Sequence, residues 1–92
     1  MIAPQETEIR GSWRVVGDKV EADPNCRRIE QLIESDLREV ARDASGWDVL
    51  YVDPSDGRHW ELTYPESQLH GGGPPTLKQL TNDEARDKYG TA

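Results

Sequence analysis

The clearest pattern in the sequence is a pair of alternating apolar runs, 47–52 and 59–64, separated by the turn-forming segment Asp53-Pro54-Ser55-Asp56-Gly57. Such alternation is typical of β-strands, so the two runs predict a hairpin. If Asp53 pairs with Arg58, one face gathers six large residues, and a shift of one residue would split them between the two faces. These residues are Trp47, Val49, Tyr51, Trp60, Leu62 and Tyr64. Leu50 and Val52 then lie on the opposite face, which predicts a central strand that is partly covered on both sides.

A helical pattern precedes this hairpin. Asp23 followed by Pro24 is a strong helix start, because the carboxylate caps free N–H groups and proline fits the first helical position. Apolar residues then recur every three or four positions, which predicts one long amphipathic helix from Pro24 to about Asp43 that ends towards Ser45-Gly46. The stripe expected to pack on the sheet is Ile29, Ile33, Leu37 and Val40.

Shorter signals complete the prediction. The runs 13–16 and 19–22 flank Gly17-Asp18 and predict a second hairpin. A short strand is expected over 77–80. Thr81 and Glu84 form a capping box that opens a final helix, with Gly90 beyond its end. The predicted order is ββαβββα, which makes residues 1–92 a single domain of the α+β class, with one long helix on a mostly antiparallel sheet.

Length and composition limit the fold and its location. A chain of 92 residues buries a thin core, and its single cysteine, Cys26, allows no internal disulfide. No apolar run approaches 18 residues, and the first ten residues lack the apolar core of a secretory signal. These features predict a cytoplasmic protein that does not associate with a membrane.

The charge is uneven along the chain. The net charge is −7, and the stretch from Asp43 to Glu66 alone carries six acids and one base, a net charge of −5. A negative protein is repelled by nucleic acid and by anionic membranes and attracts basic partners. The alternative interpretation is that this charge serves only to keep the protein soluble.

Motifs that suggest chemistry are incomplete. His70-Gly71-Gly72-Gly73 is similar to the oxyanion-hole segment of esterases, but no Gly-x-Ser-x-Gly elbow accompanies it. The 53–57 segment places its glycine fifth, whereas a calcium loop requires glycine at the sixth position. Two histidines and one cysteine that faces the helix stripe are too few for a zinc site. We therefore expect no catalytic residues, no metal site and no cofactor.

Several segments together resemble the immunity protein 27 family of bacterial polymorphic toxin systems. They are Gly46-Trp47, Tyr51-Val52-Asp53-Pro54, Asp56-Gly57-Arg58, Trp60-Glu61-Leu62-Thr63-Tyr64-Pro65 and His70-Gly71-Gly72-Gly73-Pro74-Pro75. The resemblance extends over nearly the whole chain. It implies a small cytoplasmic protein that binds a cognate toxin and blocks its activity without catalysis. The competing hypothesis is a small adaptor or ligand-binding module that uses the glycine-rich segment.

The charge distribution suggests where such a partner would bind. Many toxins of this kind are nucleases with basic clefts, which an acidic surface can enter and occlude. We expect Asp56 and Glu61 to be exposed, on the turn and on the polar strand face. The predicted contact residues are Asp53, Asp56, Glu61, Glu66, His70, Gly71, Gly72 and Gly73. The sequence does not fix the oligomeric state.

Overall fold

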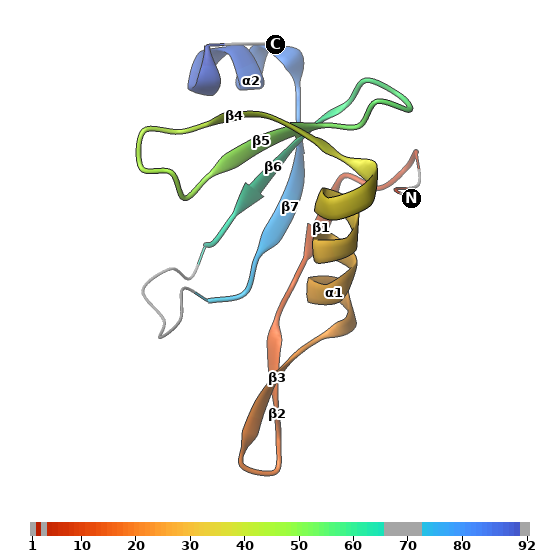
Figure 1. The fold of residues 1–92 in the computed structure, drawn as a ribbon, viewed down its shortest axis with the longest axis vertical. Coiled ribbons are helices and arrows are strands. Elements are labelled where there is room, and N and C mark those ends of the chain that lie inside the picture. The colour runs from red at the N-terminus through yellow and green to blue at the C-terminus, as the bar shows by residue number, and fades with distance from the viewer. Residues whose placement is uncertain (1, 3, 66–72, 91–92) are drawn as a thin grey trace.

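A computed structural model describes residues 2, 4–65 and 73–90 and shows an α+β fold (Figure 1). Its five-stranded antiparallel sheet has the order β1-β7-β6-β5-β4. The strands are β1 (Glu8–Arg10), β4 (Arg38–Arg42), β5 (Val49–Val52), β6 (His59–Thr63) and β7 (Thr76–Leu80). A separate hairpin of β2 (Trp13–Val16) and β3 (Lys19–Ala22) extends below the sheet in Figure 1. The helices are α1 (Pro24–Gln31), its π-helical continuation η1 (Leu32–Asp36) and α2 (Asn82–Tyr89). None of these helices, in the described ranges, is long and apolar enough to cross a membrane.

The central hairpin has the predicted register. Val49 pairs with Leu62 and Tyr51 with Trp60, while the Asp53 N–H donates to the Arg58 carbonyl at 2.9 Å. The four side chains of these two strand pairs therefore share one face. The predicted β2–β3 hairpin is also confirmed, with pairing from Trp13–Ala22 to Val16–Lys19 around the Gly17-Asp18 turn.

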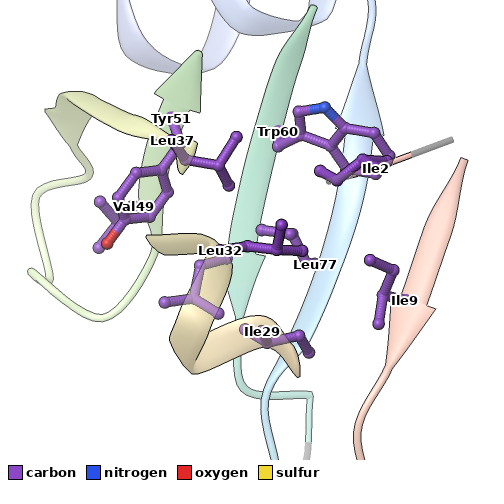
Figure 2. Close-up of a cluster of buried hydrophobic side chains, with 10 residues drawn as sticks. Ile2, Ile9, Ile29, Leu32, Leu37, Val49, Tyr51, Trp60 and Leu77 are labelled. Carbon is purple, nitrogen blue, oxygen red and sulfur yellow. The ribbon is translucent and has the colours of Figure 1, made fainter. Parts of the chain in front are cut away.

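Two apolar clusters cover the two faces of the sheet. Ile29 of α1 and Leu32 of η1 belong to one buried cluster with Trp60 and Leu77 of the sheet (Figure 2). On the other face, Leu50 is fully buried with Leu80 and with Ala85 of α2. The prediction that the strand carrying Leu50 is covered on both sides is thus confirmed, and Trp60, with no exposed surface, is the largest fully buried side chain.

The first helix is shorter than predicted. It spans eight residues of α1 and five of η1, and it ends at Asp36 instead of near Asp43. The Leu37 N–H donates to the Leu32 carbonyl at 2.7 Å and closes the last π-turn, after which Leu37 is extended. The chain continues as β4, because residues 38–42 gain a hydrogen-bonded partner in β5 that a helix would not have.

The glycine taken for a helix cap serves a turn. Gly46 has a φ of +79° and lies in the β4–β5 connection, where its N–H donates to both the carbonyl and the carboxylate of Asp43. Trp47 belongs to this connection and not to a strand, and it is 54% exposed. The predicted order ββαβββα therefore lacks two strands, β1 and β4.

Both predicted N-terminal helix caps are present. The Asp23 carboxylate accepts from the Cys26 N–H at 2.9 Å and from the Ser12 hydroxyl at 2.8 Å. These hydrogen bonds lower the pKa of Asp23 to about 2. Thr81 and Glu84 form the reciprocal capping box of α2, and Gly90 ends that helix in the left-handed conformation. Asp23 therefore ties the start of α1 to the segment just before β2.

The strand β4 can be tested by comparing two residues that a continuous helix would bury together. Leu37 is 8% exposed, whereas Val40 is 39% exposed. We expect Leu37→Ala to lower the free energy of unfolding by about 2 to 5 kcal/mol, as truncations in a core do. Val40→Ala should change it by less than about 0.5 kcal/mol. Urea unfolding monitored by circular dichroism measures both values, and equal losses would favour the longer helix.

Candidate functional site

The acidic residues of the β5–β6 turn are used within the chain. Asp53 is buried, and its carboxylate accepts from the N–H and the hydroxyl of Ser55 at 2.9 and 2.7 Å. Asp56 is exposed at the turn and accepts from the Arg58 N–H and guanidinium, which hold its pKa below the ordinary value. Arg58 in turn lies over the Trp60 ring, 5.0 Å from its centroid. The turn thus presents a carboxylate whose charge is already matched by a neighbouring cation.

Glu61 is buried, which contradicts the expectation that it is exposed. Its side chain is 10% exposed on the α2 face, where its carboxylate accepts from the Tyr89 hydroxyl and pairs with Lys88, both at 2.6 Å. Lys88 also pairs with Asp48 at 2.7 Å. Burial lowers the pKa of Lys88, but hydrogen bonds to Asp48 and Glu61 outweigh it and raise the pKa. Burial and the bond to Glu61 likewise raise the pKa of Tyr89, so Lys88 stays charged and Tyr89 stays neutral near neutral pH.

The acids concentrate around α2, and we call this region the acidic face. It has six acids and three bases, a net charge of −3: Asp43, Asp48, Glu61, Asp83, Glu84 and Asp87 with Lys78, Arg86 and Lys88. A shallow hollow between β6, β7 and α2 runs through it. The β5–β6 turn adjoins α2, since His59 contacts Asn82 at 3.2 Å.

The four predicted contact residues that the structure describes are spread along β6. Asp53 and Asp56 lie at one end of β6, and Glu61 lies in the middle of that strand. Gly73 lies near the opposite end, because Thr63 pairs with Thr76, and it is buried with a φ of +75°. Glu66, His70, Gly71 and Gly72 fall outside the described residues.

A second surface, not predicted from the sequence, lies on the α1 side. It comprises a hollow of about 230 Å³ and the exposed Trp47, whose ring meets Tyr64 edge to face at 5.9 Å. We call this surface the aromatic groove, and its members include Trp13, Glu30, Ile33, Trp47, Tyr64 and Pro75. Trp13 also lines a neighbouring hollow of about 450 Å³. The signal available in the sequence was the pair of tryptophans at element ends, but their apolar character suggested burial.

The described residues show little that suits catalysis. No three His, Cys, Asp or Glu side chains among them are grouped as metal ligands. The Cys26 thiol is buried, and burial raises its pKa, which keeps it protonated and unreactive near neutral pH. The described surface thus presents an acidic face and an aromatic groove.

Comparison with known proteins agrees with the resemblance seen in the sequence. A family model described as Immunity protein 27 matches residues 15–81. The matched region begins within β2, runs through β3, α1, η1 and the strands β4 to β7, and ends just before α2. Neither the curated proteins nor the solved structures include a match to this chain.

The burial of Glu61 predicts unequal effects of two charge reversals. Glu61→Lys should lower the free energy of unfolding by about 3 to 5 kcal/mol, because it replaces a buried carboxylate with a buried cation that repels its former partner Lys88. Asp56→Lys removes a partly exposed ion pair and should cost within about 1 kcal/mol. Chemical denaturation of the two single variants measures the difference. Similar small losses would show that Glu61 is accessible to solvent.

Proposed function

The chain belongs to the immunity protein 27 family, and on this premise we propose that it neutralises one cognate bacterial toxin domain by binding it tightly in a stoichiometric complex. The family match over residues 15–81 is the observation that carries this proposal. It favours toxin binding over the small adaptor or ligand-binding module, because the match covers the folded body of the domain and not only one segment. We place this action in the cytoplasm, where a single unpaired cysteine such as Cys26 is stable.

The acidic face suggests the nature of the toxin. Six acids against three bases create a negative potential around α2, which accelerates encounter with a basic surface. A nuclease cleft is basic because it binds phosphates. We therefore propose a nuclease whose substrate cleft faces α2 in the complex, with Asp56 of the adjoining turn at the rim.

The mechanism is occlusion and needs no turnover. Lys88 already neutralises part of the charge of Asp48 and Glu61, so these two groups hold α2 in place more than they offer free charge. The exposed carboxylates of Asp83 and Asp87 on α2 are the groups that reach a partner. Their role is to steer and orient the toxin, because exposed charges affect association more than affinity.

Inhibition should be stoichiometric. Titration of the purified toxin domain with this protein should abolish toxin activity near one molar equivalent, and a chelator added to the immunity protein beforehand should change nothing. Mass spectrometry of the toxin recovered from the complex should show an unchanged mass. Recovery of a cleaved or modified toxin would instead establish an enzymatic mechanism.

Local charge on α2 should control the association rate. The variant Asp83→Asn, Asp87→Asn and the control Asp18→Asn, Glu21→Asn change the net charge equally, but the control acids lie on the β2–β3 hairpin. We expect the α2 variant to associate about tenfold more slowly at low salt and the control to differ little, with the gap closing at high salt. Stopped-flow fluorescence measures these rates after equal thermal melts are confirmed. Equal slowing by both variants would mean that only net charge matters.

A further inference from the structure

The tryptophans of this chain are divided between the core and the surface. Trp60 is fully buried, whereas Trp13 is 38% exposed and Trp47 is 54% exposed. Among the side chains whose exposure the structure describes, Val40 is the one other large hydrophobic residue that is comparably exposed. Exposed tryptophans forgo burial that a thin core would use, so two of them beside one groove call for an explanation in terms of binding.

The two tryptophans flank a continuous apolar surface. Trp13 from β2 and Ile33 from η1 line the hollow with Tyr64, and Tyr64 meets Trp47 at a ring angle of 77°. Pro75 closes the hollow on the side of β7. Five separate segments of the chain therefore build one aromatic groove.

The groove limits what can occupy it. Its hollow of about 230 Å³ is below the range of about 300 to 1,000 Å³ of pockets for drug-sized ligands, so it fits one or two side chains. Within the described part of the chain, Glu30 is the only charged residue that lines the hollow, and it forms no ion pair there. The exposed Glu34 follows it one helical turn later. An apolar side chain next to a lysine or an arginine is complementary to this surface in both shape and charge.

We propose that the aromatic groove is the anchor site for the toxin, and that it receives an apolar side chain flanked by a basic one on the toxin surface. This inference rests on the function proposed above. Trp47 and Asp48 are adjacent in sequence, and the first contacts Tyr64 of the groove while the second pairs with Lys88 of the acidic face. The β4–β5 turn thus joins the two surfaces, so that one toxin domain contacts both. The acidic face steers the encounter, and the groove supplies the contact that keeps the complex together.

The test measures affinity for the toxin domain encoded beside this chain, by isothermal titration calorimetry with purified proteins. Trp47→Ala and Trp13→Ala each remove one side of the groove, and each should raise Kd by about 30-fold or more, as truncation of a tryptophan hot spot does. Glu30→Lys should raise Kd as well, with an effect that shrinks at high salt.

Val40→Ala is the matched control. Val40 is exposed to nearly the same extent as Trp13, but it lies on β4 and does not line the groove. It should leave Kd within about twofold of the wild-type value. Thermal melts of all four variants establish that each is folded, and the use of two tryptophan variants from different elements ensures that at least one result is interpretable.

The outcomes separate the two proposals. A wild-type protein that neither binds nor neutralises the neighbouring toxin domain overturns the proposed function and the anchor site with it. A wild-type protein that neutralises the toxin while the folded tryptophan variants bind as tightly as it does overturns the anchor site alone. Losses confined to the groove variants, with Val40→Ala unchanged, support the anchor site.

Discussion

The register of the β5–β6 hairpin is the constraint on which the rest of the structure depends. With Asp53 opposite Arg58, Trp60 enters the core beneath α1, while Leu50 and Glu61 face α2. The same register, followed past the ends of the strands, places Trp47 opposite Tyr64 and so builds the aromatic pair. Because side chains alternate along a strand, a shift of one residue would bury Glu61 beneath α1 and expose Trp60 to the α2 side.

The parts of the fold that local sequence determines were predictable. Both hairpins with short turns and both helix caps follow from residues close together in the chain, and the structure confirms them. β4 was not predictable, because Leu37, Val40 and Ala41 continue the helical spacing by coincidence, and as an edge strand β4 lacks a clear alternation. Gly46 did not distinguish a helix end from a turn between two strands, because a left-handed glycine suits both. Pairing with a distant strand decided the outcome.

The candidate site was predictable only in part. The sequence placed the acidic excess on the β5–β6 hairpin, but it did not show that the carboxylate of Glu61 is satisfied by Lys88 and Tyr89. The Glu61 contacts depend on how α2 packs on β6, and the Glu61–Tyr89 bond joins residues 28 apart in the chain. The aromatic groove was hidden for a different reason: the alternating pattern placed Trp47 on the apolar face of the hairpin, and nothing in the sequence brought Trp13 close to it.

The irregular pairing of β4 has a consequence for the life of the free protein. Val40 is an extra residue between the pairs Glu39–Tyr51 and Ala41–Leu50, so β4 carries a bulge, and charged side chains occupy most of its other positions. Bulges and charges on an edge strand oppose the addition of further strands from another molecule. An immunity protein must accumulate in its unbound form without assembling into fibrils. The bulged and charged edge of β4 opposes such assembly.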